Sequence, residues 1–152
     1  MKADTKFTTA IHLCLYLHYR GEKVLTSREM AESVATNAVV IRRLATELRK
    51  AGIIESTAGK LGGFYLKKNI RQITLWDIYK AVNDRDFFHK PKVNAECPVS
   101  SNLAELITRP FLDAELAMRP SLEKINIAEL YHQLISLLEQ QKISNLKIQK
   151  VE

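Results

Sequence analysis

Cysteine is scarce in this sequence of 152 residues, which contains only Cys14 and Cys97. Two cysteines so far apart form no framework of regular spacings, so we expect no disulfide scaffold and favour a reducing compartment. Long apolar runs are also missing, since no window contains the roughly 18 uncharged apolar residues that a membrane span needs. The first ten residues lack the apolar stretch of a secretory signal. We therefore predict a cytoplasmic protein that makes no use of a membrane.

Sequence motifs of catalysis are missing as well. There is no Ser/His/Asp order, carboxylate pair, phosphate-binding glycine loop or zinc-protease helix. The four histidines show no close pairing at metal-ligand spacing; they are His12, His18, His89 and His132. With five glycines and four prolines, the chain is an ordinary globular sequence. We predict one globular domain, or one domain with a helical extension, that is not an enzyme.

Negative charge is scarce in the N-terminal half. Residues 1–72 contain 13 Lys and Arg but 6 Asp and Glu, a net charge of +7, whereas residues 73–152 contain 10 and 11, a net charge of −1. Lys and Arg gain affinity for a polyanion by releasing its counterions. The asymmetry therefore favours a nucleic-acid-binding N-terminal region joined to a part with another role. A solvated basic surface is the alternative.

Helical periodicity and capping signals predict three helices in this basic half. They are expected over about 4–19, 27–34 and 38–51. Asp4 or Thr5 can cap the first helix. Thr26 and Glu29 form the Ser/Thr-x-x-Glu capping box of the second, and Gly52 is placed to stop the third in a left-handed conformation.

A hairpin signature follows the third helix. The β-branched run 53–56 and the run 64–66 flank a turn that contains Gly59, Gly62 and Gly63. We expect these runs to form a two-stranded wing. Taken alone, the pair Gly62 and Gly63 also fits an ordinary hairpin turn.

The second half of the chain is expected to be helical. A helix over 73–82, capped at Thr74, completes the first domain; an irregular connector, a helical dimerisation region and a tail that frays follow it over 83–102, 103–143 and 144–152. The dimerisation region divides into helices at about 103–123 and 127–143. Pro110 either bends the first of these helices or begins it.

A helical wheel separates two faces of the third helix. The inner face is apolar and consists of Ile41, Leu44, Ala45 and Leu48. The outer face contains Val39, Arg43, Thr46 and Lys50, with Arg42 and Glu47 on its flanks. The outer face is therefore basic, with one exposed valine.

The predicted elements follow the order of a winged helix-turn-helix: a helix, a short turn, a second helix and a glycine-rich hairpin. In this fold the second helix enters the DNA major groove. Arginine donor forks suit guanine edges or phosphates, Asn37 can pair with adenine, and Val39 can meet a thymine methyl. Hydroxyls and a cation at the start of the supporting helix suit a phosphate, and Lys60 on the wing can reach the minor groove. The candidate DNA contacts are Thr26, Ser27, Arg28, Thr36, Asn37, Val39, Val40, Arg42, Arg43 and Lys60.

Each candidate also has a structural explanation. Asn37 alone fits a helix cap better than a base reader. The surface charges Arg42, Arg43 and Lys50 can instead be paired with Glu47. A winged helix also serves as a non-catalytic protein-interaction adaptor. Salt separates these functions, because phosphate binding weakens steeply as the salt concentration rises.

The run VVIRRLATELRKAGIIESTAGKLGGFYL at 39–66, followed by ITLWDIYKAV at 73–82, resembles the Rrf2 family of bacterial winged-helix transcription regulators. The resemblance extends over residues 1 to about 140. It implies a homodimer joined through a long helix near the C-terminus. It also implies a pseudo-palindromic operator and, in most members, repression.

Two departures from the family pattern stand out. Members with an iron–sulfur cluster have three cysteines in the connector, whereas this connector has only Cys97, so we predict no cofactor. His89 and Glu96 near that thiol make a weak metal signal. Ala58 stands where many relatives carry a wing arginine, which weakens the expected minor-groove contact or transfers it to Lys60.

The C-terminal half raises three further expectations. Its apolar surface is more than the N-terminal half can cover, and the candidate dimer contacts are Leu106, Ile107, Phe111 and Leu134. Cys97 is either a structural, partly buried thiol or a redox thiol without a nearby resolving cysteine. An unidentified small-molecule effector between the DNA-binding core and the C-terminal helices is a further hypothesis.

Overall fold

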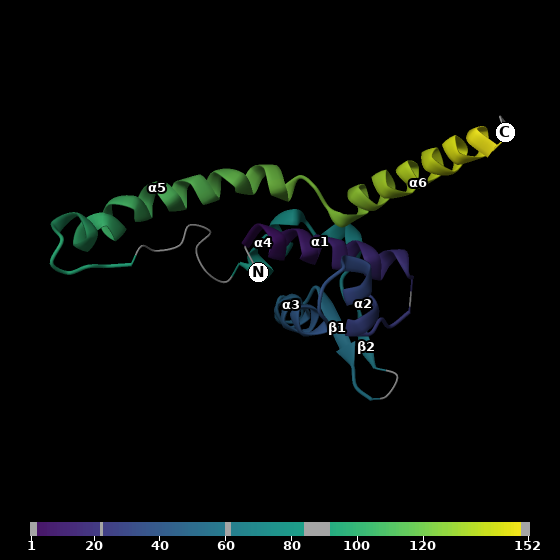
Figure 1. The fold of residues 1–152 in the computed structure, drawn as a ribbon, viewed down its shortest axis with the longest axis horizontal. Coiled ribbons are helices and arrows are strands. Elements are labelled where there is room, and N and C mark those ends of the chain that lie inside the picture. The colour runs from purple at the N-terminus through teal and green to yellow at the C-terminus, as the bar shows by residue number, and fades with distance from the viewer. Residues whose placement is uncertain (1–2, 22, 60–61, 84–91, 150–152) are drawn as a thin grey trace.

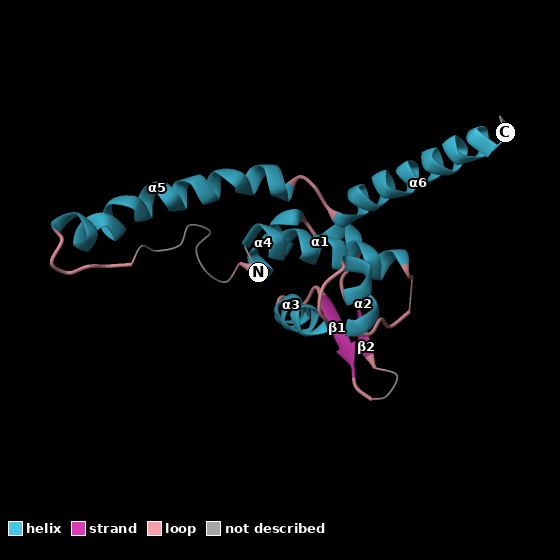
Figure 2. Ribbon diagram, viewed as in Figure 1, coloured by secondary structure: helices cyan, strands magenta, loops and turns pink. Residues whose placement is uncertain are grey.

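Helices dominate the computed structural model, which describes residues 3–21, 23–59, 62–83 and 92–149. The elements are α1 (Ala3–Tyr19), α2 (Ser27–Val34), α3 (Ala38–Lys50), β1 (Ile54–Thr57), β2 (Gly63–Leu66), η1 (Ile70–Gln72), α4 (Leu75–Val82), α5 (Pro98–Glu123) and α6 (Ile127–Gln149). Helices α1 to α4 cluster with the hairpin, while α5 and α6 project from this cluster in opposite directions (Figure 1). The secondary structure in Figure 2 confirms the predicted class, a mainly helical winged helix-turn-helix with a two-stranded wing.

The hydrophobic core joins α1, α2, α3, β1 and α4 to the first turn of α6. Its fully buried large side chains are Leu13, Leu17, Leu25, Met30, Ile41, Leu44, Leu48, Ile53, Ile54, Ile73, Ile78 and Ile127. The predicted inner face of α3 is completely buried among them. Burial of each such side chain contributes roughly 1.5–3 kcal/mol, so the core fixes the rotation of α3 about its own axis.

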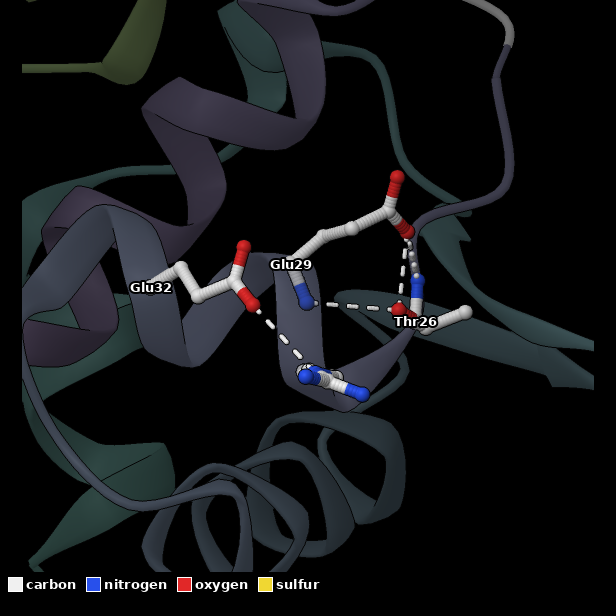
Figure 3. Close-up of polar contacts among 4 residues, drawn as sticks. Thr26, Glu29 and Glu32 are labelled. Carbon is white, nitrogen blue, oxygen red and sulfur yellow. Dashed lines mark hydrogen bonds and ion pairs between the residues drawn. The ribbon is translucent and has the colours of Figure 1, made fainter.

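The helix-turn-helix begins at the predicted capping box (Figure 3). The backbone N–H of Glu29 donates to Thr26 Oγ1 over 3.2 Å, and the backbone N–H of Thr26 donates to Glu29 Oε2 over 2.8 Å. The hydrogen bond from the Thr26 backbone makes the largest contribution to lowering the pKa of Glu29. Thr74 and Asp77 repeat this box at the start of α4. Both caps use residues three apart, which is why they were predictable from sequence.

The wing is an antiparallel pair whose register runs from Ile54 opposite Leu66 to Thr57 opposite Gly63. It is anchored to the segment before α2, because Leu25 and Phe64 exchange two backbone hydrogen bonds of 2.8 and 3.0 Å. A Cβ on Gly63 would lie 2.4 Å from Leu25 O. Glycine is therefore required here by close backbone approach, beyond what the turn alone demands.

Helix α5 begins five residues earlier than predicted. The irregular connector was expected to reach residue 102, but α5 starts at Pro98, where a proline suits the first helical position because it has no N–H to satisfy. Side chains strengthen this start: Ser101 Oγ donates to Cys97 O over 3.0 Å and Asn102 Nδ2 donates to Pro98 O over 2.7 Å. The helix continues through Pro110, so the prediction that it begins there was wrong.

Helices α1 and α6 both extend beyond their predicted ends. The first helix already includes Ala3, so the prediction that Asp4 or Thr5 caps it was wrong; alanine is the best helix former. Helix α6 continues to Gln149, although the tail was predicted from residue 144. Residues 144–149 contain no glycine or proline that would stop a helix. No helix in the described part of the chain is long and apolar enough to cross a membrane.

The C-terminal helices are tied to α4 at two places. At its start, the N–H of Leu75 donates to Ile125 O and the N–H of Ile127 donates to Ile73 O, each over 2.9 Å. In its second turn, the hydroxyl of Tyr79 donates to Glu115 Oε1 over 2.9 Å. Burial first, and then the Glu115 carboxylate, raise the pKa of Tyr79, so the phenol stays protonated as the donor.

The close approach at Gly63 predicts the result of a substitution. Gly63→Ala is expected to lower the free energy of unfolding by about 1–3 kcal/mol, because the added methyl would collide with the backbone of Leu25. Urea denaturation followed by circular dichroism measures this change. Gly21→Ala is the control, since φ is +73° there but nothing lies within 4 Å of the added atom. Equal losses in the two variants would contradict the collision at Gly63.

Candidate nucleic-acid interface

The outer face of α3 is exposed as the helical wheel predicted. Val39 is 45% exposed, and Arg43, Thr46 and Lys50 are also exposed. Arg42 is exposed on the flank of the same helix, and Val40 is half-buried. The first turns of α3 therefore present an arginine and an apolar side chain together to the solvent.

Asn37 lies at the turn between α2 and α3 and is the N-cap of α3. Its Oδ1 accepts a hydrogen bond of 2.7 Å from the backbone N–H of Val39. The capping interpretation is therefore confirmed, and base reading by Asn37 stays a prediction. Thr36 beside it is exposed, with its backbone N–H donating to Ala31 O over 2.9 Å.

The acidic residue on α3 does not neutralise the basic face. Glu47 Oε2 forms an ion pair of 2.8 Å with Lys6 Nζ on α1. The alternative that Glu47 pairs with Arg42, Arg43 and Lys50 is therefore wrong. No carboxylate in the described part of the chain forms an ion pair with Arg42, Arg43 or Lys50. The charge on this surface is free to meet an anion from outside.

The start of α2 places three predicted phosphate contacts in different settings. The Thr26 hydroxyl is engaged in the capping box with Glu29, while Ser27 is half-buried beside it. Arg28 pairs with Glu32 over 3.3 Å (Figure 3), and their side chains are 88% and 68% exposed. An exposed pair of this spacing contributes only about 0.2–0.5 kcal/mol. A phosphate can therefore displace Glu32 at small cost.

A cleft of about 390 Å³ lies between the start of α2, α3 and the wing. Its lining residues are Thr26, Ser27, Arg42, Thr46, Arg49, Ser56, Thr57, Gly62, Gly63 and Phe64. Within the cleft, Arg49 Nη1 donates to Ser56 Oγ over 2.9 Å. Arg49, Ser56 and Thr57 were missed as candidates. One helical stripe of α3 contains Arg42, Thr46 and Arg49, and this spacing could have been read from the sequence. The docking of β1 beside that stripe could not.

The wing carries the remaining predicted DNA contact. Gly59 near its tip has a φ of +102°, a left-handed conformation that favours glycine. Lys60 lies outside the described residues, so its minor-groove contact stays a prediction. Gly62 needs to be glycine because a Cβ there would lie 2.4 Å from Thr57 O.

The predicted dimer contacts occupy two different surfaces. Leu106 on α5 is 67% exposed, whereas Ile107 and Phe111 are half-buried. Leu134 on α6 is half-buried and lines an apolar cleft of about 340 Å³ against α1. Further exposed apolar side chains on α5 are Val99, Leu112 and Leu116. Helix α5 therefore has an apolar surface that its own chain leaves largely uncovered.

The two cysteines do not meet. Cys14 is completely buried in the core, and burial raises the pKa of its thiol to about 12. Cys97 is half-buried as the N-cap residue of α5 and makes no side-chain capping bond. Among the described residues, no group of three His, Cys, Asp or Glu is placed to hold a metal ion. His89 lies outside the described residues.

Residues 3–133 match the family Rrf2, which is described as an iron-dependent transcriptional regulator. The chain's own residues do not fit an iron–sulfur cluster held by cysteines, the ligands that such clusters normally take. One of the two cysteines is enclosed by the core, which leaves a single thiol on the surface. The family match therefore supports the fold and the regulatory role. The two cysteines do not fit a cluster held by cysteine ligands.

Comparisons with individual proteins agree with this family. The chain is 32% identical over 133 residues to YwnA of Bacillus subtilis, which is named as an HTH-type transcriptional regulator. The matched region covers 86% of this chain and 98% of YwnA. A crystal structure of a protein named as a transcriptional regulator from Lactobacillus plantarum aligns with a TM-score of 0.70 and 28% identity over 95% of this chain and 99% of that one. The fold is shared with CymR, the global cysteine regulator of B. subtilis, at a TM-score of 0.59 and 21% identity over 84% and 94% of the two chains. The chain therefore belongs to the Rrf2 family and is a DNA-binding transcriptional regulator.

Proposed function

We propose that this regulator is a homodimeric repressor that reads a pseudo-palindromic operator with the outer face of α3. The observation that carries the proposal is the unneutralised basic face of α3, whose own acidic residue is turned away to Lys6. In a helix-turn-helix, the N-terminal residues of the second helix contact base edges in the major groove. Val39 and Arg43 occupy those positions with exposed side chains.

The dimer is proposed from the surface of α5. This helix has 26 residues and none of them is buried. Its length corresponds to about 39 Å at 1.5 Å per residue, and Figure 1 shows it projecting away from the DNA-binding cluster. A helix with exposed leucines along its length is covered most simply by a second copy of itself. Such a dimer presents two α3 helices to two half-sites.

A repressor that acts by binding needs no catalytic group, and we infer that this chain does not act as an enzyme. Its operator lies on the chromosome, so the proposal places the protein in the cytoplasm.

The adaptor hypothesis predicts binding to a protein with little salt dependence, whereas the basic face of α3 favours DNA. The small-molecule effector stays a prediction, because the described residues do not identify its chemistry.

A substitution in α3 tests base reading. Arg43→Ala is expected to weaken operator binding by about 1–3 kcal/mol and to relax sequence preference at one operator position. Fluorescence anisotropy with an operator and its single-base variants measures both effects. Arg71→Ala is the matched control, since this exposed arginine lies on η1, which packs against α6. Unchanged affinity and preference in a folded Arg43→Ala protein would remove Arg43 from the interface.

Sedimentation equilibrium tests the dimer. The intact protein is expected to be a dimer at micromolar concentration, and Leu106→Glu is expected to shift it toward the monomer by placing a charge in an apolar interface. Operator binding should weaken greatly, because a monomer contacts only one half-site. Glu105→Gln changes the neighbouring exposed side chain and serves as the control. A wild-type monomer at micromolar concentration would contradict the proposal.

Iron analysis tests the expected independence from a cluster. With one cysteine in the core and one at α5, protein purified without oxygen should be colourless and iron-free and should bind its operator in the presence of a chelator. Any peroxide response should disappear in Cys97→Ser. Brown protein with stoichiometric iron would overturn this expectation. A peroxide response that survives in Cys97→Ser would show that the Cys97 thiol is structural.

A further inference from the structure

The cleft between α2, α3 and the wing has the composition of an anion site. Two arginines, Arg42 and Arg49, line it together with hydroxyl groups from both sides, and among the described residues none in the lining carries a carboxylate. The nearest acidic residue on β1, Glu55, pairs with Lys67 Nζ over 3.5 Å. Nothing in the lining therefore competes with an incoming anion for the guanidinium groups.

Arg49 is held in place at this cleft. Its Nη1 donates to Ser56 Oγ over 2.9 Å, which joins the last turn of α3 to the middle of β1. A guanidinium carries five N–H donors in a rigid plane, so this one bond leaves the others for a second acceptor. Arg42 lies two turns earlier on the same stripe of α3, with Thr46 between them. The guanidinium groups of Arg42 and Arg49 therefore both line the cleft.

The location of the cleft identifies its ligand. In a winged helix-turn-helix bound to DNA, the second helix of the pair, here α3, occupies the major groove and the wing reaches the adjacent minor groove. These two grooves are separated by a single sugar-phosphate strand, which must cross the molecule between α3 and the wing. The cleft lies between these elements.

We propose that this cleft binds the phosphates of that strand, with Arg49 and Arg42 as phosphate ligands and the hydroxyls of Ser27 and Thr57 as additional donors. The inference rests on the proposed binding of α3 in the major groove. It separates the arginines of α3 by role, since Arg43 reads a base while Arg42 and Arg49 hold the backbone. Phosphate contacts fix the register of the protein on the duplex but carry no direct sequence information.

The salt dependence of operator binding tests the inference. Arg49→Ala should reduce the slope of log K against log salt by about 1 and weaken binding roughly tenfold near 0.1 M salt, equally for the operator and its single-base variants. Arg49→Lys keeps the charge and should keep most of the slope. Arg71→Ala is again the matched control. A slope unchanged in Arg49→Ala, while wild-type protein binds the operator, would overturn the phosphate site.

Neutral methylphosphonate linkages in the operator distinguish a phosphate ligand from a brace for the wing. One linkage at the strand between the two grooves should weaken wild-type binding roughly tenfold and Arg49→Ala binding much less, because the two changes remove the same contact. Additive losses at every linkage would show that Arg49 only positions the wing. A wild-type protein without salt-dependent operator binding would instead refute the proposed function itself.

Discussion

The backbone pairing between Leu25 and Phe64 holds the wing beside the start of α2 and so closes one side of the candidate interface. It fixes the wing against the residues that lead into α2, and its two hydrogen bonds require the close approach that Gly63 permits. On the other strand of the wing, Ser56 accepts the hydrogen bond from Arg49 of α3. The cleft therefore has one wall on β2, held to the segment before α2, and another on β1, held to α3.

The charge pattern of the surface depends on a second contact, between Lys6 and Glu47. By pairing across to α1 over 2.8 Å, Glu47 binds α3 to the core and leaves the outer face of α3 positive. The pair is only partly exposed, with side-chain exposures of 23% and 27%. Solvent screens it less than the fully exposed pair of Arg28 and Glu32. The contact therefore favours both the placement of α3 and its free positive charge.

Local signals predicted the helix-turn-helix closely. The bounds of α2 agree with the prediction at both ends, and the capping box of Thr26 and Glu29 explains the agreement at its start. Helix α3 ends within one residue of its prediction because Gly52 follows it. The start of α5 was misplaced because DRDFFHKPKVNAECPVSSN shows no helical periodicity and its helix begins only at the proline after Cys97. The cleft could not be predicted, because the contact of Arg49 with Ser56 depends on how a strand docks on a helix. The two exposed leucine-rich helices were predictable as elements, but their opposite directions were not.

The attachment of α4 limits how a signal in the C-terminal helices can reach the DNA. Backbone hydrogen bonds from Leu75 N–H to Ile125 O and from Ile127 N–H to Ile73 O hold the start of α4 to the segment that joins α5 and α6, and Tyr79 in the second turn of α4 is held to Glu115. Trp76 stacks on Tyr79 with ring centroids 5.1 Å apart, and Phe7 of α1 meets the edge of the same tyrosine at 5.6 Å. These contacts connect α4 to the core that fixes α3, so α3 cannot turn without repacking buried side chains. In the proposed dimer, a change in the angle between the two α5 helices would therefore move each DNA-binding domain as a unit. Such a movement would alter the separation of the two α3 helices, on which binding to the two half-sites of the proposed operator depends.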